Sequence, residues 1–291
     1  MPSPRSSRLP RSYLYVPGDR PDRLAGAAGR GADALIADFE DAVSHPAKDA
    51  ARAAVGSWLR EPGRSDGPAC WVRINAESAA ADVEAVVCRS LHGVVVPKAE
   101  VDLLELVDEE ISQREREIGV EPGTIGVLPL VETAQGLLDV ARLARAPRVR
   151  RLGIGEADLI AELGLAPGPD RDELAPLRLQ VVVASAAARI AAPVAPTSTD
   201  FRDLDHFAAT SRSLQALGFR GRTAIHPAQV AVINEVFTPR PEEVVAARAL
   251  VQAFEQAGSG VLVDERGRMV DAAVVRSARQ VLELAGEADQ G

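Results

Sequence analysis

Aromatic residues are scarce in this chain of 291 residues: Phe, Trp and Tyr make up 3% of it, although 46% of the residues are hydrophobic. A large core must therefore be built mainly from Ala, Val, Leu and Ile. Such a composition suits the interior layers of an α/β barrel better than an aromatic β-sandwich. The length agrees, because α/β barrels of about 250 residues fold as one domain.

Two further absences bear on the partners of the chain. The formal net charge is −9 and no run of Lys and Arg occurs, which argues against nucleic acid as a partner. An acyl-CoA partner stays open, since one basic pocket can bind its phosphates whatever the net charge. No apolar run approaches the ~18 residues of a membrane helix, so no membrane partner is expected.

Cysteine is also rare, and Cys70 and Cys88 fit neither a CxxC motif nor a metal-ligand spacing. We expect two buried thiols in the reducing cytoplasm. The sequence contains no cluster of His and Cys that could hold zinc. Residues 1–10 are rich in Ser, Arg and Pro but lack the apolar core of a secretory signal, and we expect a disordered tail there.

Short apolar runs alternate with longer amphipathic stretches, which is the pattern of βαβ units. The expected strands are Tyr13–Val16, Ala34–Asp38, Trp71–Ile74, Gly93–Pro97, Gly126–Val131, Arg151–Ile154, Val194–Thr197 and Thr223–Ile225. The expected helices include Ala47–Trp58, Val101–Ile118, Ala134–Ala144 and Leu204–Leu217. Eight βα units predict an α/β protein with a closed (β/α)8 TIM barrel over residues 11–236. An open doubly wound sheet is the alternative, but Val16–Asp19 is not the Gly-rich turn that such a sheet would place after its first strand.

Residues 237–291 extend beyond the last expected strand. Pro241–Gln256 is predicted to form a helix, followed by a hairpin that turns at Asp264–Gly267 and a helix over Asp271–Ala285. This helix–hairpin–helix extension is too small for a domain and too regular for a disordered tail. We interpret it as a lid or as an arm exchanged between subunits.

Polar and charged residues stand where the expected strands end, which is where TIM barrels carry their active sites. These residues are Asp38, Glu40, Asp41, Arg73, Asn75, Lys98, Glu132, Asp158 and His226. Residues that only ended strands would more often be Gly, Asn or Ser. As a set, the strand ends therefore indicate a functional site.

Glu132 and Asp158 close consecutive strands, so both carboxylates should face one pocket. Two carboxylates with further positions left for water and substrate suit Mg²⁺, a hard ion that prefers oxygen ligands. A structural alternative exists for Asp158, which could cap a helix beginning near Leu159.

Positive charge is expected at the same pocket from Arg11, Arg73 and Lys98, where it could bind a substrate carboxylate or a CoA phosphate. The alternative is ion pairing with the cluster Asp38/Glu40/Asp41, and one residue can do both. A Schiff base on Lys98 is disfavoured, because neighbouring acids would keep its ammonium group charged. His226 could orient substrate or donate a proton, or could be structural.

Together these segments resemble the citrate lyase β-subunit-like family of the HpcH/HpaI aldolase/citrate lyase group, which includes malyl-CoA and citramalyl-CoA lyases. The resemblance runs from Arg11 to about Ala285. It is carried by the order and spacing of the motifs Arg11–Gly18, Asp38–Val43, Val72–Asn75, Val96–Glu100, Val131–Ala134, Asp158-Leu159, Thr199–Asp203 and Ile225–Gln229.

The resemblance implies a homotrimer or hexamer that binds Mg²⁺ through Glu132 and Asp158. By similarity, Arg11, Arg73 and Glu132 contact the substrate, and Lys98 lines the CoA entrance or supports the acidic cluster. The segment Gly267–Asp271 resembles a C-terminal motif whose aspartate reaches into a neighbouring subunit. Asp271 would then be a catalytic residue that transfers a proton in trans.

The implied activity is Mg²⁺-dependent cleavage of a 3-hydroxyacyl-CoA of the malyl-, methylmalyl- or citramalyl-CoA type into an acyl-CoA and a 2-keto acid. A malyl-CoA-type thioesterase is one alternative, and a citrate lyase subunit acting on an acyl-carrier-protein thioester is another. Three departures from the family pattern bear on substrate choice more than on the metal site. Ala157 rather than Glu precedes Asp158, and Ala273 rather than Pro stands two positions after Asp271. The third departure is that Gly164–Leu177 is rich in proline, with Pro176 where an aromatic residue is common.

Overall fold

The computed structural model describes residues 9–169, 171–257, 261–263, 267 and 269–286. Its contacts divide the chain into a unit of residues 10–235 and a second unit that contains the residues from Val236 onward. Of the segment expected to be a disordered tail, only Leu9 and Pro10 lie within the described residues. Among the described residues, no helix combines the length and the apolar character needed to cross a bilayer.

The first unit contains a curled parallel sheet in the order β6-β5-β4-β3-β2-β1-β7, with the arrangement of a TIM-barrel-like α/β fold. The strands are β1 Ser12–Pro17, β2 Ala34–Asp38, β3 Ala69–Arg73, β4 Leu91–Val96, β5 Gly126–Val131, β6 Gly153–Ile154 and β7 Arg222–Ala224. All pairings in this sheet are parallel.

The strand expected at Val194–Thr197 is not formed as such, and the prediction of eight full strands is wrong in this respect. The segment makes only two isolated parallel bridges, from Val194 to Gly153 and from Ala195 to Arg222. The physical reason lies in Pro193 and Pro196, which have no N–H to donate to a ladder. These two bridges still connect β6 with β7, the two ends of the seven-stranded sheet.

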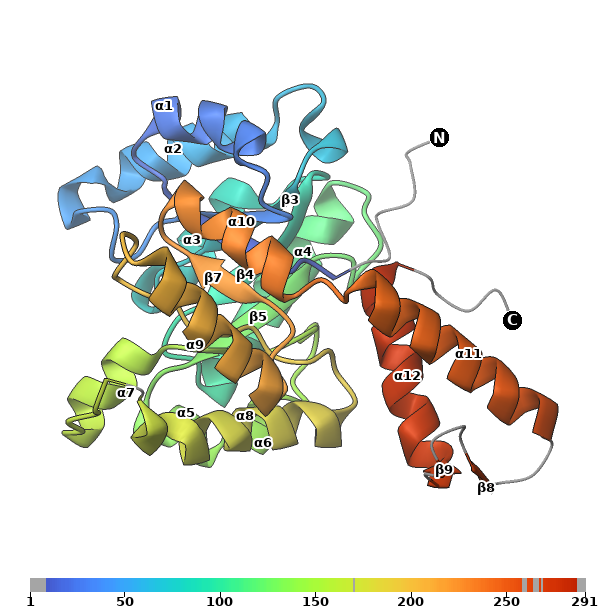
Figure 1. The fold of residues 1–291 in the computed structure, drawn as a ribbon. Helices are drawn as coiled ribbons and strands as arrows, with labels where there is room; N and C mark the ends of the chain where they lie inside the picture. The colour runs from blue at the N-terminus through green and yellow to red at the C-terminus, as the bar shows by residue number, and fades with distance from the viewer. Residues whose placement is uncertain (1–8, 170, 258–260, 264–266, 268, 287–291) are drawn as a thin grey trace. The chain divides into compact units, whose positions relative to one another are not determined.

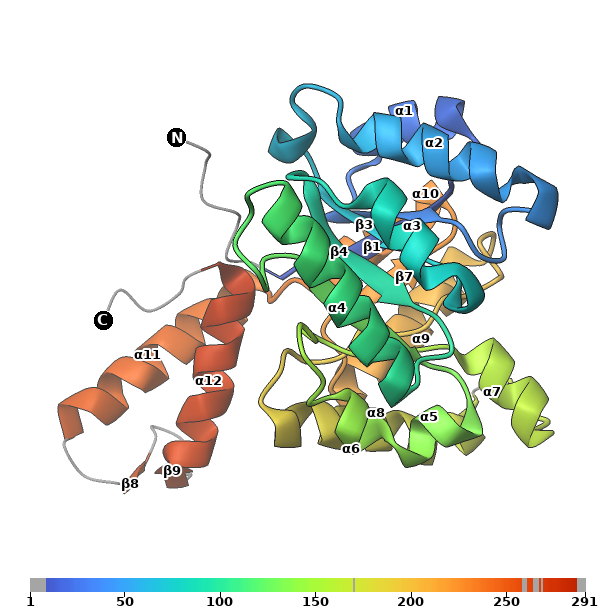
Figure 2. The ribbon, with the colours of Figure 1, turned by 180° about the vertical axis from the view of Figure 1, so that it is seen from behind.

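Helices surround the sheet, as the two opposite views in Figures 1 and 2 show. They are α1 Pro21–Ala27, α2 Lys48–Leu59, α3 Ala79–Val86, α4 Val101–Glu117, α5 Ala134–Leu138, α6 Val140–Leu143, α7 Glu156–Leu163, α8 Ala175–Ala188, α9 Leu204–Leu217 and α10 Pro227–Val236. Local chemistry sets their ends. The Asp203 carboxylate caps α9 by accepting from His206 N at 2.8 Å, and Gly218 ends the helix at φ 112°.

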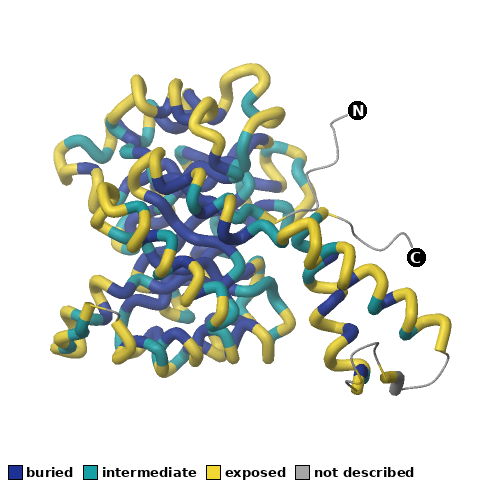
Figure 3. The backbone as a smooth tube through the Cα atoms, viewed as in Figure 1, coloured by how far each residue is buried: buried dark blue, intermediate teal, exposed yellow. Residues whose placement is uncertain are grey.

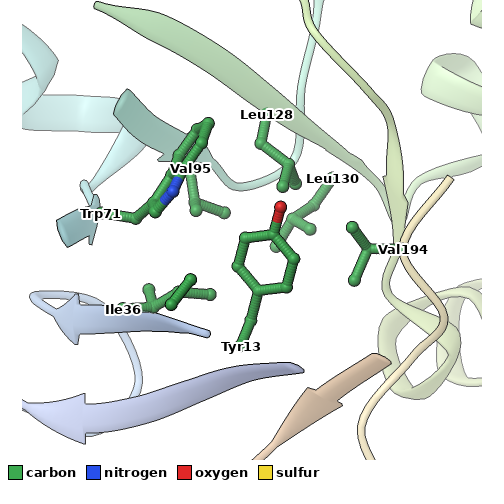
Figure 4. Close-up of a cluster of buried hydrophobic side chains, with 8 residues drawn as sticks. Tyr13, Ile36, Trp71, Val95, Leu128, Leu130 and Val194 are labelled. Carbon is green, nitrogen blue, oxygen red and sulfur yellow. The ribbon is translucent and has the colours of Figure 1, made fainter. Parts of the chain in front are cut away.

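The interior of the sheet is filled by side chains that alternate along the strands, as expected for a barrel. Tyr13, Ile36, Trp71, Val95, Leu128, Leu130 and Val194 form this cluster together with Ala34 (Figure 4). The rings of Tyr13 and Trp71 meet edge to face with centroids 6.1 Å apart. Gly93 makes room for this packing, because a Cβ there would lie 2.3 Å from the Trp71 ring. The burial colours of Figure 3 show that the sheet is buried and that the outer faces of the helices are exposed.

Arg151 closes the amino-terminal end of this interior, opposite to the carboxyl ends of the strands. Its side chain is 1% exposed, and it donates to the carbonyl oxygens of Pro10 and Ala192 at 2.8 and 2.9 Å. It also donates to the Tyr13 hydroxyl at 3.3 Å. The amino-terminal ends of β1 and β6 are thereby tied to the segment before Val194.

The second unit contains α11 Pro241–Ala257, the antiparallel strands β8 Val261–Val263 and β9 Met269–Asp271, and α12 Ala272–Ala285. A small core holds it together, made of Ala247, Val251, Val270, Val275, Ala278 and Leu282. The turn expected at Asp264–Gly267 lies outside the described residues except for Gly267.

Candidate active site

The inward rows of side chains change from apolar to polar toward the carboxyl ends of the strands. Side chains two positions apart on a strand point to the same face, so each apolar core residue predicts the direction of a neighbour. The pairs are Tyr13 with Tyr15, Ile36 with Asp38, Trp71 with Arg73 and Leu130 with Glu132. The alternation of the strands therefore brings four polar side chains to one end of the interior.

A cavity of about 760 Å³ opens at this end. Its wall includes Tyr15, Asp38, Arg73, Glu132, Asp158 and His226. Arg23 and Arg30, from α1 and the turn after it, also line it. Most of the strand-end residues selected in the sequence thus meet around one space.

Glu132 is one of the deeply buried carboxylates in this wall, at 3% exposure. Burial raises its pKa to about 7, and the charges of Glu40 and Asp158 add to the rise. The backbone N–H of Lys98 donates to Glu132 Oε1 at 2.6 Å and opposes the rise. A carboxylate placed so close to other acids with so little solvent favours a bound cation.

Asp158 lies in the first turn of α7 and is exposed to the cavity. The helix begins at Glu156, and Gly155 occupies the N-cap position. The structural alternative, in which Asp158 is the N-cap of this helix, is therefore wrong. Its carboxylate is left to face the same space as Glu132.

This donor set fits Mg²⁺. Among the described residues no group of three or more His, Cys, Asp or Glu could enclose a metal ion. An ion between Glu132 and Asp158 would then complete its shell with water and substrate oxygens, as Mg²⁺ commonly does. Structural zinc sites need four protein ligands, and catalytic zinc sites usually three, so the described residues do not favour zinc.

Gly155 provides the space that Glu132 occupies, and we predict that Gly155→Ala weakens Mg²⁺ binding. A Cβ at this position would lie 2.2 Å from Glu132 Oε2 and 2.5 Å from Glu132 Cβ, so the carboxylate must move. Calorimetry should give at least about a tenfold loss of Mg²⁺ affinity, the range seen when partners of metal ligands are changed. Gly29→Ala is the matched control, because nothing lies within 4 Å of its added Cβ. Equal affinity in the two variants would show that the Glu132 position is not restricted by Gly155.

Arg73 is held by the acidic cluster. Its guanidinium donates to both Asp38 oxygens, Nε to Oδ1 at 2.7 Å and Nη2 to Oδ2 at 2.6 Å. Nη1 lies 2.6 Å from Glu40 Oε2 and 3.2 Å from Asp41 Oδ2. The ion pairing that the sequence left open is thus present, and Arg73 brings its charge to the cavity wall as part of a network.

Two lysines fix the loop that carries this cluster. Lys98 has a left-handed backbone (φ 44°), and its Nζ lies 2.8 Å from Glu40 Oε1, so it supports the acidic cluster. Lys48 Nζ donates to the carbonyl oxygens of Phe39 and Glu40 at 2.6 and 3.1 Å and to Asn75 Oδ1 at 2.6 Å. The loop after β2 is therefore tied to the loop after β3.

Arg11 does not join the other cations, which corrects the expectation that it lies at the same mouth. It precedes β1, at the opposite end of the strand from the cavity. Its guanidinium makes a two-point ion pair with Asp33, at 2.8 and 2.9 Å. The reason is the direction of the chain: a residue before a parallel strand faces the amino-terminal end of the barrel.

His226 and Asp271 have local structural contacts. His226 Nδ1 accepts from Ala228 N at 3.1 Å, and its ring stacks on Phe201 with centroids 4.7 Å apart. Asp271 belongs to the second unit, where its carboxylate caps α12 by accepting from Ala273 N at 2.8 Å and Val274 N at 3.1 Å. These hydrogen bonds, led by the one from Val274, lower the pKa of Asp271.

A comparison with known families shows to which family the chain belongs. The family model for HpcH/HpaI aldolase/citrate lyase matches residues 11–227. The chain belongs to this family. Within it, the sequence is 31% identical over 290 residues to the citrate lyase subunit beta of Leuconostoc mesenteroides subsp. cremoris, covering 96% of this chain and 94% of that protein.

Two further members of the family differ in what they bind or do. A (3S)-malyl-CoA thioesterase of Cereibacter sphaeroides is 34% identical over 281 residues, covering 94% of this chain and 93% of that protein. The crystal structure of protein CitE from Mycobacterium tuberculosis in complex with magnesium, acetoacetate and coenzyme A is also similar. It has a TM-score of 0.76 and 31% identity, and it covers 97% of this chain and 100% of that one.

Three site residues were missed in the sequence, although two of them had a signal there. Tyr15 follows Tyr13 at the alternation of a strand, which predicts an inward side chain. Arg23 lies in the segment directly after β1, where a barrel carries its first active-site loop. Lys48 had no such signal, because it lies on the helix after the β2 loop and reaches back nine residues to Phe39.

Proposed function

We propose that this chain is a Mg²⁺-dependent carbon–carbon lyase of the cytoplasm that cleaves a 3-hydroxyacyl-CoA into an acyl-CoA and a 2-keto acid. The fold proposed for it is a TIM-type barrel whose seven-stranded sheet closes through the bridges at Val194 and Ala195, with a C-terminal helix–hairpin–helix extension. One observation carries the activity: Glu132 and Asp158 face a single cavity beside Arg73, and the pKa of Glu132 is raised to about 7. The magnesium complex of the M. tuberculosis relative supports the choice of metal.

The reaction divides into steps that the residues of the cavity can serve. Mg²⁺, when bound by Glu132 and Asp158, would supply Lewis-acid polarisation of the substrate oxygens. A general base takes the hydroxyl proton, the O–H electron pair forms the C=O of the keto acid, the carbon–carbon bond breaks, and its electron pair passes to the thioester as an enolate. Arg73 offsets the charge that develops on the substrate oxygens. Asp271 of a neighbouring protomer, whose pKa would rise once docking shields the carboxylate from water, would deliver a proton to the enolate carbon and complete the acyl-CoA.

The thioester is proposed to be a CoA ester, because the cavity rim offers charge for its phosphates. Arg23 and Arg30 line the cavity and are exposed, and neither has an ion pair or side-chain hydrogen bond with another described residue. Guanidinium groups bind phosphates through two parallel hydrogen bonds. The CoA complex of the M. tuberculosis relative also supports this choice.

The pure protein should be incubated with Mg²⁺ and malyl-, methylmalyl- or citramalyl-CoA while keto acid and released thiol are measured separately. A lyase forms keto acid and leaves the thioester intact, so no thiol appears. Thiol without keto acid would instead identify a thioesterase like the relative of C. sphaeroides. Keto acid formed only from a thioester on an acyl carrier protein would identify a citrate lyase subunit.

We propose that Asp271 acts in the active site of a neighbouring protomer within a homotrimer or hexamer. Asp271→Asn should leave the melting temperature unchanged, because Asn caps a helix as well as Asp does, but it should abolish keto-acid formation. Asp271→Asn and Glu132→Gln chains, each inactive alone, should regain partial activity after refolding together, since some mixed interfaces pair two intact halves. If mixed oligomers form but regain no activity, Asp271 acts in the active site of its own chain or in no active site.

A further inference from the structure

The two tyrosines of the chain, Tyr13 and Tyr15, stand two positions apart on β1. Both therefore point to the same face of the strand, into the barrel interior. Tyr13 belongs to the apolar cluster of Figure 4, and Tyr15 packs against that cluster one step nearer to the cavity. The two phenols share a strand and a direction but meet different surroundings.

Tyr13 has a structural role. It is fully buried, its ring packs edge to face on Trp71, and Arg151 donates to its hydroxyl at 3.3 Å. It is absent from the residues that line the cavity. Its polar atom thus has a structural partner, as buried hydroxyls normally do.

Tyr15 has no such partner for its hydroxyl. Its ring lines the cavity, and Arg73 Cζ lies over it at 5.0 Å from the centroid. Within the described part of the chain, no residue forms a hydrogen bond with the Tyr15 hydroxyl. The apolar packing needs only the ring, so a phenylalanine would pack equally well at this position. The hydroxyl is therefore not needed for the fold.

The charges around Tyr15 determine what its hydroxyl can do. Asp38, Glu40 and Glu132 all lie close enough to act on it electrostatically. Burial and these three acids raise the pKa of Tyr15, whereas Arg73 opposes the rise. The phenol therefore keeps its proton at neutral and mildly alkaline pH and offers a hydrogen-bond donor rather than a base.

We propose that Tyr15 is a further catalytic residue, which donates a hydrogen bond to an oxygen of the bound 2-keto acid and of the hydroxyacyl substrate from which it forms. The inference rests on the proposed lyase function for the identity of this ligand. A neutral donor is well suited to the position, because Arg73 already has ion pairs with three carboxylates. The neutral hydroxyl can bind an anionic oxygen, and it adds no positive charge that would form an ion pair with the acidic cluster instead.

The kinetic test compares Tyr15→Phe with Tyr13→Phe, which remove the same atom from the same strand. Tyr15→Phe keeps the ring under Arg73 and should lower kcat/KM by roughly tenfold to a hundredfold, the effect of losing one donor to a reacting oxygen. Tyr13→Phe should change kcat/KM less than about threefold. Equal activity of the Tyr15→Phe variant and the wild type would overturn the inference.

A binding test separates this inference from the proposed function. The dissociation constants of pyruvate, glyoxylate and oxaloacetate for the Mg²⁺-loaded protein are measured by calorimetry for the wild type and both variants. We expect Tyr15→Phe to weaken the preferred keto acid by at least about fivefold, whereas Tyr13→Phe leaves it unchanged. Incorporated 3-fluorotyrosine gives a second readout, because its two ¹⁹F resonances can be assigned from the two variants. The keto acid should then shift the Tyr15 resonance beyond the shift caused by Mg²⁺ alone.

The outcomes of the two tests are distinguishable. Keto-acid formation with unchanged binding and turnover in Tyr15→Phe would overturn the role of Tyr15 and leave the lyase standing. Weakened keto-acid binding in Tyr15→Phe, in a protein that cleaves none of the thioesters, would support the contact and contradict the lyase. Failure of the wild-type protein to bind any of the three keto acids would overturn both.

Discussion

Glu132→Gln is expected to abolish Mg²⁺ binding and to lower kcat/KM by about a thousandfold, yet to make the metal-free protein more stable above pH 7. The loss of activity follows from removing a ligand of an ion whose Lewis-acid effect amounts to several kcal/mol. The amide can still accept the hydrogen bond that Lys98 N donates to Glu132 at 2.6 Å. The variant therefore removes the charge and leaves the local packing in place.

The gain in stability follows from the direction of the pKa shift. The pKa of Glu132 is raised from 4.5 to about 7 in the folded protein, so between these values the folded state binds more protons than the unfolded state. Stability of the metal-free wild type should fall as pH rises from about 4.5 to 7 and then level off. The total cost is up to about 3 kcal/mol, and Glu132→Gln removes it.

Urea unfolding at pH 5 and pH 8 without metal, combined with Mg²⁺ calorimetry, measures these effects. Glu117→Gln, an exposed position on α4, is the control and should change neither stability nor Mg²⁺ affinity. In the wild type, Mg²⁺ affinity should rise with pH up to about 7, because the ion binds the ionised carboxylate. Wild-type Mg²⁺ affinity in Glu132→Gln would remove Glu132 from the metal site.

The second large effect concerns Arg73→Met, which should destabilise the protein by about 3–5 kcal/mol, the usual cost of leaving one partner of a buried ion pair uncompensated. Asp38 is 2% exposed and receives two hydrogen bonds from Arg73, so its charge would remain without a counterion. Arg73→Lys, which keeps the positive charge, is a milder change at the same position. A lysine cannot form the two-point pair, so some loss of stability is expected there too.

A double variant isolates this cause. Asp38→Asn combined with Arg73→Met removes both charges and should recover most of the stability lost in Arg73→Met alone, while kcat/KM stays low. Urea midpoints of the wild type, the two single variants and the double variant give the coupling energy. An unchanged midpoint in Arg73→Met would show that the ion pair with Asp38 contributes nothing to folding.

Much of this fold could be predicted from the sequence, because strand alternation and strand ends are local signals. The pattern gave the positions of seven strands, and Glu132 and Asp158 followed from the rule that barrels carry their sites at the carboxyl ends. The eighth strand was overestimated because the apolar run around Val194 outweighed the prolines on either side of it. Arg11 was misplaced although the same rule, applied to the residue before a strand, puts it at the opposite end.

Other features depend on contacts that are distant in the sequence. Nothing near Lys48 indicates that its ammonium group holds the loop at Phe39 and Asn75. Ion pairing fixes Arg73 through residues 32 to 35 positions away. The raised pKa of Glu132 arises from burial and from the charges of Glu40 and Asp158, which only the folded chain brings together.

The origin of the hydrogen on the acyl product tests the central claim most directly. Cleavage of malyl-, methylmalyl- or citramalyl-CoA by the Mg²⁺-loaded protein in D₂O can be followed by mass spectrometry of both products. A lyase that passes through a thioester enolate should give an acyl-CoA with one solvent deuterium on its α-carbon and an equal amount of 2-keto acid. Free CoA together with the intact hydroxy acid, carrying no deuterium on carbon, would contradict the account.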